Sequence, residues 1–356
     1  MKPSSLDFLK RLLDSPGPSG FETAPARIWR AETERFADEV TADVSGNTIA
    51  AVNPHGEPRI MFAGHIDEIG LMIVHVDDDG YLYFSPIGGW DAQVLVGQRV
   101  VIAAKDGPVN GVIGRTPIHL MTSEERDKVA KPADLWIDIG APSKAEALQR
   151  VRVGDPAVLA ASAVELPGGR LVSRSIDNRI GAYVVAEALR LLAASKPAAA
   201  VFSVATTQEE IGLGGGGGAR TSANGLDPRV AIVVDVTHAT DHPNAEKKRH
   251  GDTKLGGGPV LSRGSAVNPV VYELLVDVAE AEGIPYSIQA APRDTGTDAD
   301  SIHTARRGIA TGLVSVPNRY MHSPNEMVDV VDLERAASLL AAFAGRVTPA
   351  TDFTPR

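Results

Sequence analysis

The chain has 356 residues, of which 43% are hydrophobic and none is cysteine. This length predicts one large domain plus a smaller one, and the lack of cysteine excludes disulfides, thiolate zinc sites and thiol nucleophiles. A formal net charge of -10 argues against nucleic acid as a partner, because phosphate binding requires clustered Lys and Arg. The one basic cluster, Lys247–Arg249, is short, and we expect it to be a solvated loop.

The amino-terminal segment MKPSSLDFLKRLLDS has the spacing of an amphipathic helix. It lacks the unbroken apolar stretch of a signal peptide, and no segment of the chain is long and apolar enough to span a membrane. We therefore expect a soluble, cytoplasmic protein with no membrane partner. The residues expected to face the core are Leu6, Phe8, Leu9, Leu12 and Leu13.

Four apolar runs rich in β-branched residues predict buried strands, and helical patterns lie between or beside them. The runs cover residues 59–66, 198–206, 230–236 and 309–316, and the clearest helical patterns cover 178–194 and 268–282. Such runs suit strands covered on both faces by helices, which indicates the α/β fold class. Three of the runs end in ionisable residues, and sites in such sheets gather at the carboxyl ends of the strands.

Residues 70–166 differ in pattern from the rest of the chain. They contain short alternating pieces broken by Gly and Pro, such as LMIVHV and YLYFSP, and little candidate chemistry. This pattern is typical of a small β barrel or sandwich. We therefore predict a catalytic domain divided into residues 1–69 and 167–356, with a β domain of residues 70–166 inserted between them.

His65 and Asp67 stand two residues apart in AGHIDEIG, so on an extended strand both side chains leave from the same face. A metal-binding His usually donates its second ring N–H to an oxygen acceptor. Asp67 could be that acceptor or could bind the metal directly. The alternative is an ordinary polar strand end.

Asp177, in SRSIDNRIGA, lies just ahead of an apolar helical pattern that Asn178 can begin. Either residue could simply cap the helix. As a metal ligand, Asp177 could instead bridge two cations through its two carboxylate oxygens.

Further candidate ligands follow the later strands. Glu209 and Glu210 end the run AVFSVATTQEE, Asp235 lies in AIVVDVTHATDHP, and His322 lies in NRYMHSPNE. Two imidazoles and three carboxylates suit a pair of Zn, Co or Mn ions. Glu209 is then free to take a proton from a water activated between two metals, as a hydrolase requires. The candidate ligands are His65, Asp177, Glu210, Asp235 and His322.

These motifs resemble the cobalt- or zinc-dependent glutamyl and tetrahedral aminopeptidases, which are relatives of the leucyl aminopeptidases. The resemblance runs nearly from end to end. It rests on PGPSGFE, AGHIDEIGLM, HLMTSEERDK, SRSIDNRIGAY, TTQEEIGLGG, VVDVTHATDHP and NRYMHSPNE. It implies a catalytic domain with a central mixed, mostly parallel sheet flanked by helices, of the zinc-peptidase/phosphorylase-like type, plus a small inserted β barrel.

The resemblance also implies a role for each site residue. One metal would have His65 and Asp235, the other Glu210 and His322, and Asp177 would be shared. Asp67 would orient His65, and Glu209 would be the general base. Each subunit would bind two divalent metal ions, Zn or Co, with Mn also compatible.

The function implied is the metal-dependent removal of N-terminal residues from peptides. In this family the inserted domain forms dimers, and the dimers commonly build a tetrahedral dodecamer, so we expect a homo-oligomer. Two alternatives stay open: a dinuclear-metal deacylase or carboxypeptidase of the same architecture, and a non-catalytic binding protein on this fold. The intact ligand set argues against the second alternative.

Other polar residues near this set are less closely tied to it. His238 and His242 follow Asp235, and we expect them to line the cleft or orient ligands. Asp298 is expected to support a ligand or line the cleft. We expect the remaining histidines to be surface or structural residues: His55, His75, His119, His250 and His303.

The glycine run 214–218 is more uniform than the family usually shows. No GK[ST] follows it, and Arg220 is the only nearby cation, which argues against a phosphate-binding loop. We expect a flexible loop entering a helix. If this loop lines the cleft, together with Asp294–Asp298, it influences which N-terminal residue is preferred.

Overall fold

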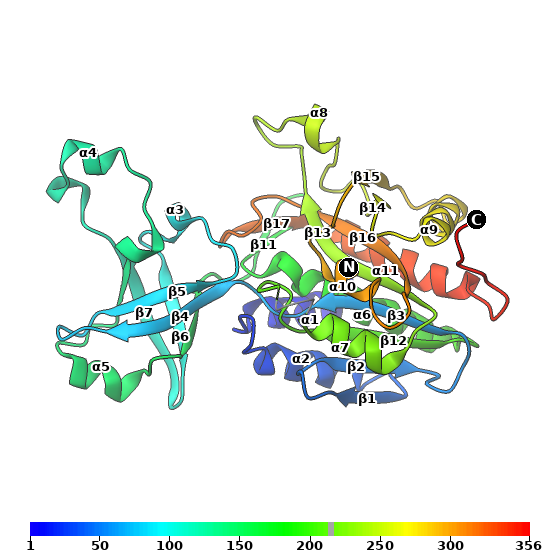
Figure 1. The fold of residues 1–356 in the computed structure, drawn as a ribbon, viewed down its shortest axis with the longest axis horizontal. Coiled ribbons are helices and arrows are strands. Elements are labelled where there is room, and N and C mark those ends of the chain that lie inside the picture. Colours follow the sequence, from blue (N-terminus) through cyan, green and yellow to red (C-terminus); the bar gives the residue numbers. More distant parts are fainter. Residues whose placement is uncertain (213–216) are drawn as a thin grey trace.

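The computed structural model describes residues 1–212 and 217–356, which form an α/β body and a β barrel standing beside it (Figure 1). The body contains an eight-stranded sheet in the order β1-β2-β12-β3-β13-β16-β14-β15. Its strands are β1 (Glu39–Ala42), β2 (Thr48–Val52), β3 (Arg59–His65), β12 (Ala200–Thr206), β13 (Val230–His238), β14 (Val260–Gly264), β15 (Ser287–Ala291) and β16 (Ala310–Asn318).

The sheet is mixed and mostly parallel, as predicted. Strands β12, β3, β13 and β16 lie side by side in parallel, and β14 pairs in parallel with β15, whereas β1, β2 and the β14–β16 pair are antiparallel. The four parallel strands are the four apolar runs of the sequence. β13 and β16 each continue two residues past the predicted end, because their pairing extends to His238 and Asn318.

Helices cover the sheet. α6 (Ile176–Ser195) packs on β3, β12 and β13 and is itself flanked by other helices, which explains why all of its first fourteen residues are buried. Every residue of β12 is buried, as expected for a strand covered on both faces. The other helices of the body are α1 (Pro3–Asp14), α2 (Thr23–Thr33), α7 (Gly217–Leu226), α8 (Lys247–His250), α9 (Pro269–Ala281), α10 (Asp298–Ile302) and α11 (Val330–Arg346).

Two local expectations need correction. In α1, Leu6 is only half-buried, and Ser5 is buried in its place, where its hydroxyl donates to Glu187 (3.3 Å). Lys247–Arg249 was expected to be a loop. It belongs to the one-turn helix α8, which projects from the body with its side chains exposed (Figure 1). No helix in the described part of the chain is long and apolar enough to cross a membrane.

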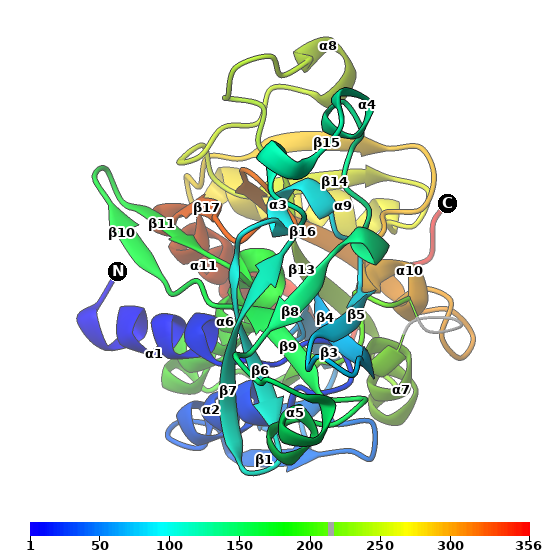
Figure 2. The ribbon, with the colours of Figure 1, turned by 90° about the vertical axis from the view of Figure 1, so that its left-hand side faces the viewer.

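The barrel is closed by six strands in the order β4-β5-β8-β7-β6-β9 and has its own hydrophobic core. It faces the viewer in Figure 2. Its elements are β4 (Gly70–Val76), β5 (Leu82–Ile87), α3 (Ala92–Leu95), β6 (Arg99–Ala104), β7 (Gly107–Gly114), α4 (Ser123–Arg126), β8 (Trp136–Asp138), α5 (Lys144–Arg150) and β9 (Pro156–Leu159). The chain then returns to the body, where β10 (Val164–Leu166), β11 (Arg170–Ser173) and β17 (Glu326–Asp329) form a small antiparallel sheet.

The fold brings the candidate site residues to one edge of the main sheet. The parallel strands β3, β12, β13 and β16 all end at this edge. His65 and Asp235 lie on strands, whereas Glu209, Glu210 and His322 lie in the segments that follow β12 and β16. Segments that are far apart in the sequence therefore meet there.

Candidate metal centre

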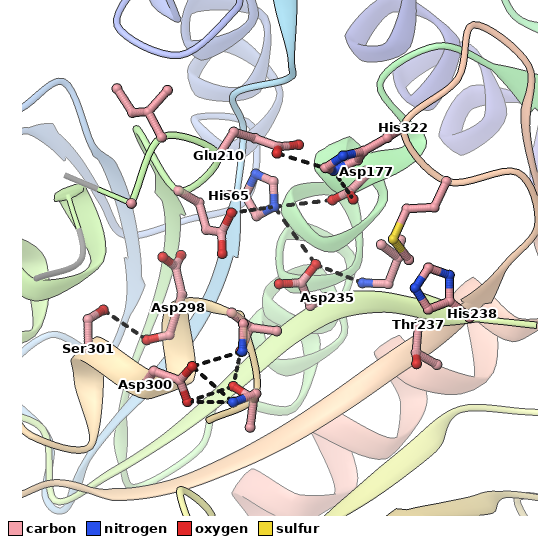
Figure 3. Close-up of a pocket in the computed structure, with 18 of the residues that line it drawn as sticks. His65, Asp177, Glu210, Asp235, Thr237, His238, Asp298, Asp300, Ser301 and His322 are labelled. Atoms are coloured by element: carbon pink, nitrogen blue, oxygen red, sulfur yellow. Dashed lines mark hydrogen bonds and ion pairs between the residues drawn. The ribbon is translucent and has the colours of Figure 1, made fainter. Parts of the chain in front are cut away.

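A cavity of about 800 Å³ opens at the carboxyl ends of the parallel strands. All five candidate ligands and Glu209 line it, and so do residues from α10 and the segment before it (Figure 3). Asp67 does not line the cavity and is fully buried.

The five candidate ligands form two groups that share Asp177. In the first group, His65 Nε2 lies 3.3 Å from Asp177 Oδ1 and 3.8 Å from Asp235 Oδ1. In the second, His322 Nε2 lies 3.4 Å from Asp177 Oδ2 and 3.3 Å from Glu210 Oε2 (Figure 3). The two oxygens of Asp177 therefore face two different histidines.

The backbone at the start of α6 turns Asp177 toward these histidines. Asp177 and Asn178 have non-helical dihedral angles, and the Asn178 side chain accepts the N–H of Gly181 (3.0 Å). Asn178 also donates to the carbonyl of Val234 on β13 (2.8 Å). Asn178 thus caps the regular helix, and the Asp177 carboxylate is left for the cavity.

Residues in the left-handed backbone region stand beside the site residues. Ser175 (φ 60°) stands two residues before Asp177, and Gln208 (φ 64°) directly precedes Glu209. His322 itself has φ 57°. This conformation is unfavourable for residues other than glycine and persists where the surrounding contacts hold it.

Asp67 contacts one residue of each ligand group. Its Oδ1 lies 3.4 Å from His65 Nδ1, while its Oδ2 accepts the hydroxyl of Ser19 (2.6 Å) and the N–H of Glu210 (3.2 Å). Burial would raise the pKa of Asp67, but His65 and these donors hold it below its usual value. An ionised Asp67 is suited to orient the His65 ring.

Glu209 belongs to neither group. Its Oε2 lies 3.8 Å from His65 Nε2, and its side chain is 17% exposed toward the cavity. Burial raises the pKa of Glu209 to about 10, although His65 lowers it, and the carboxylate of Asp235 raises it further. A cation bound nearby would favour the ionised form.

The residues present fit divalent cations. Glu210 Oε1 is buried without a hydrogen-bond partner among the described residues. The carboxylates of Asp177 and Glu210 raise the pKa of His322 to about 11, so a proton there offsets negative charge. Oxygen and imidazole donors are those that Zn, Co and Mn accept.

Of the three other residues predicted near the ligands, two line the cavity and one does not. Asp298 is buried, lines the cavity and accepts the hydroxyl of Thr206 (2.5 Å), and burial raises its pKa to about 6. His238 lines the cavity wall, as expected. His242 does not line it: its ring lies 6.5 Å from that of Tyr320, and its Nδ1 lies 2.9 Å from the Pro243 carbonyl.

The remaining histidines do not line the cavity, and part of the glycine run lies outside the described residues. His55, His75, His119 and His250 are exposed, and His303 is half-buried. Gly214–Gly216 lie outside the described residues. Gly217 and Gly218 begin α7, and Arg220 on that helix lines the cavity.

Two contacts of His322 escaped the sequence reasoning. Its Nδ1 lies 2.8 Å from the carbonyl oxygen of Gly89, which belongs to the barrel segment between β5 and α3. Its backbone N–H donates to Glu326 (2.8 Å), a buried carboxylate on β17. Glu326 could have been noticed in the sequence, because it is the acidic residue that ends NRYMHSPNE. The Gly89 contact could not, because every residue has a backbone carbonyl.

Comparison with known proteins shows which family the chain resembles. A family model described as M42 glutamyl aminopeptidase matches residues 46–339. The chain is 37% identical over 353 residues to the lysyl aminopeptidase of Pyrococcus furiosus, and the match covers 98% of this chain and 99% of that relative.

Solved structures show the same fold. The TET aminopeptidase from the marine sediment archaeon Thaumarchaeota archaeon SCGC AB-539-E09 is 36% identical, with a TM-score of 0.92 and coverage of 97% of each chain. The Pyrococcus horikoshii TET1 peptidase, which can assemble into a tetrahedron or a large octahedral shell, is 34% identical, with a TM-score of 0.84 and coverage of 96% of this chain and 100% of that one. The chain therefore belongs to the M42 glutamyl aminopeptidase family.

Proposed function

We propose that two divalent cations bind each subunit and that Glu209 acts as the general base of peptide hydrolysis beside them. Family membership makes the chain a metal-dependent aminopeptidase, a hydrolase acting on peptides. The observation that carries the two-cation proposal is the placement of Asp177, whose two oxygens face the histidines of two separate groups. One cation would lie among His65, Asp177 and Asp235, the other among Asp177, Glu210 and His322.

The chain's own residues supply the proton transfers. Bound cations would activate a water molecule and polarise the scissile carbonyl. Glu209 would accept a proton from that water while the water oxygen bonds to the carbonyl carbon. Glu209 would then donate the proton to the leaving amine as the peptide bond breaks. Asp67 would hold His65 through Nδ1, which leaves Nε2 directed at the cation. We propose Zn or Co as the metal, with Mn also compatible.

Three forms of one tripeptide test this function: one with a free amine and an amidated carboxyl end, one with an acetylated amine and an amidated carboxyl end, and one with an acetylated amine and a free carboxylate. An aminopeptidase should cleave a tripeptide whose amine is free and whose carboxyl end is amidated, and should not cleave the same peptide after acetylation of its amine. A carboxypeptidase would require the free carboxylate instead, and a deacylase would attack the acetylated form. Several N-terminal residues, including Lys, Glu and Leu, should be assayed with Zn²⁺ and with Co²⁺, and release of the acetyl group or of the C-terminal residue would contradict the proposal.

We also propose that the barrel in the predicted segment 70–166 forms a dimerisation domain inserted into a catalytic domain of residues 1–69 and 167–356, and that the dimers build a tetrahedral dodecamer. The end of the predicted segment needs correction, because β10 (Val164–Leu166) pairs with β11 of the body and so belongs to the catalytic domain. The barrel's segment between β7 and β8 supports this assembly, because Ile118, Leu120 and Val129 are 60%, 75% and 63% exposed. Apolar side chains gathered on one segment favour self-association. The cytoplasmic location remains a prediction.

The assembly can be measured by light scattering. The wild-type chain should scatter as an oligomer many times its 37.4 kDa subunit mass. The double variant Ile118→Asp, Leu120→Asp should lower that mass, because burying a charged side chain between two subunits costs free energy. As a control, Val44→Asp changes a fully exposed apolar residue of the body and should leave the mass unchanged. A wild-type mass equal to that of one subunit would refute the assembly.

A further inference from the structure

Glu326 lies between two candidate ligands of the metal centre and contacts the backbone of both. Its Oε2 accepts the N–H of Asp177 (2.9 Å), and its Oε1 accepts the N–H of His322 (2.8 Å). Asp177 stands at the start of α6, whereas His322 follows β16. One carboxylate therefore joins two segments that are distant in the sequence and that both supply the second ligand group.

Both backbone N–H groups need such an acceptor. Ser175 before Asp177, and Tyr320 and His322 themselves, have φ angles of 60°, 62° and 57°, so neither segment continues a regular helix or strand there. A buried N–H without a partner is costly. The two oxygens of Glu326 accept one N–H group each, so both donors are satisfied by one side chain.

The backbone of Glu326 is fixed by the same two segments. Glu326 begins β17, where it is paired with Ser173 of β11, a few residues before Asp177. Its neighbour Met327 exchanges backbone hydrogen bonds with Arg319, a few residues before His322 (both 3.0 Å). The carboxylate is thus held at a set position relative to both ligands.

Glu326 is 2% exposed and makes no ion pair with Lys or Arg in the described part of the chain. Burying such a group costs free energy unless hydrogen bonds compensate for the lost water. Glutamine has nearly the same volume but would turn an NH₂ group toward one of the two N–H donors. The site therefore requires two acceptor oxygens at this place.

We propose that Glu326 is a positioning residue that sets the separation of Asp177 and His322 and so the cation affinity of the group Asp177, Glu210 and His322. This inference rests on the proposed function, because it needs that group to bind a cation. Side chains that orient metal ligands typically contribute 10- to 100-fold to metal affinity. Glu326→Gln should therefore weaken the binding of one cation by about 10- to 100-fold. The affected cation should be the one at the group that contains both Asp177 and His322.

Asp332 offers a matched control. It too is a buried carboxylate, and its two oxygens accept the N–H groups of Gly256 (2.6 Å) and Gly258 (2.8 Å). It lies on α11 and does not line the cavity. Asp332→Asn and Glu326→Gln should both lower the melting temperature of the metal-free chain, but Asp332→Asn should leave both cation affinities unchanged.

The experiment titrates metal-free wild type, Glu326→Gln and Asp332→Asn with Zn²⁺ by calorimetry and with Co²⁺ by its visible absorption, and records the melting temperature of each metal-free chain. Glu326→Asp is included because it keeps the carboxyl group but is one methylene too short to reach both N–H groups. It should therefore also weaken cation binding at the group Asp177, Glu210 and His322. Wild-type affinity in both Glu326 variants, or an equal loss in Asp332→Asn, would overturn the positioning role. A wild type that binds fewer than two cations would overturn the proposed function and this inference together.

Discussion

Glu209→Gln should lower kcat by about 10²- to 10⁴-fold, the usual contribution of a general base, while the chain still binds its cations. The amide has the shape of the carboxylate but cannot accept a proton from water. Glu209 lies outside both candidate ligand groups, and its Oε2 is 3.8 Å from His65 Nε2, close enough to reach a water bound beside that histidine. Steady-state kinetics combined with metal analysis of the same sample would measure both quantities.

The neighbouring residue supplies the control. Glu210→Gln makes the same chemical change one residue later, but Glu210 belongs to the second ligand group, with its Oε2 3.3 Å from His322 Nε2. We expect this variant to lose cation affinity, and added metal should restore part of its activity. The Glu209 variant should gain nothing from added metal. Near wild-type turnover in Glu209→Gln would remove the assignment of the base.

Asp177→Ala should abolish the binding of both cations, whereas His322→Ala should weaken only one. The difference follows from geometry, because Asp177 contributes one oxygen to each group and His322 belongs to the second group alone. Metal content after dialysis against trace Zn²⁺ should therefore fall to none in the first variant and to about one ion in the second.

Asp298→Asn is the matched control for this pair. Asp298 is a buried carboxylate that lines the same cavity, but it belongs to neither ligand group and instead accepts the Thr206 hydroxyl. The variant should keep both cations. If Asp177→Ala retained two bound ions, Asp177 would not be the shared ligand and the arrangement proposed for the centre would be wrong.

The sequence predicted those parts of the fold that depend on local patterns. The apolar runs 59–66 and 230–236 are the buried strands β3 and β13, because continuous β-branched segments are stable where both faces are covered. The carboxyl ends of parallel strands share one edge, so His65 and Asp235 could be expected to meet. The change to short alternating pieces after Gly70 similarly marked the barrel.

Features that depend on backbone groups from distant segments could not be predicted in this way. The acceptor of the His322 ring is a carbonyl oxygen of Gly89 in the barrel, and any residue carries such an oxygen. Glu326 is a recognisable acid, but its partners are two N–H groups exposed only by the irregular backbone at Asp177 and His322. His242 was expected near the ligands because it follows Asp235 closely. The chain leaves the cavity after β13, and the His242 ring lies beside Tyr320 instead.

The most direct test of the two-cation centre is anomalous X-ray scattering at the zinc edge from crystals grown with Zn²⁺. The account predicts two peaks in each subunit, one among His65, Asp177 and Asp235 and one among Asp177, Glu210 and His322, about 3.5 to 4 Å apart. A single peak, or two peaks that do not share Asp177, would contradict it.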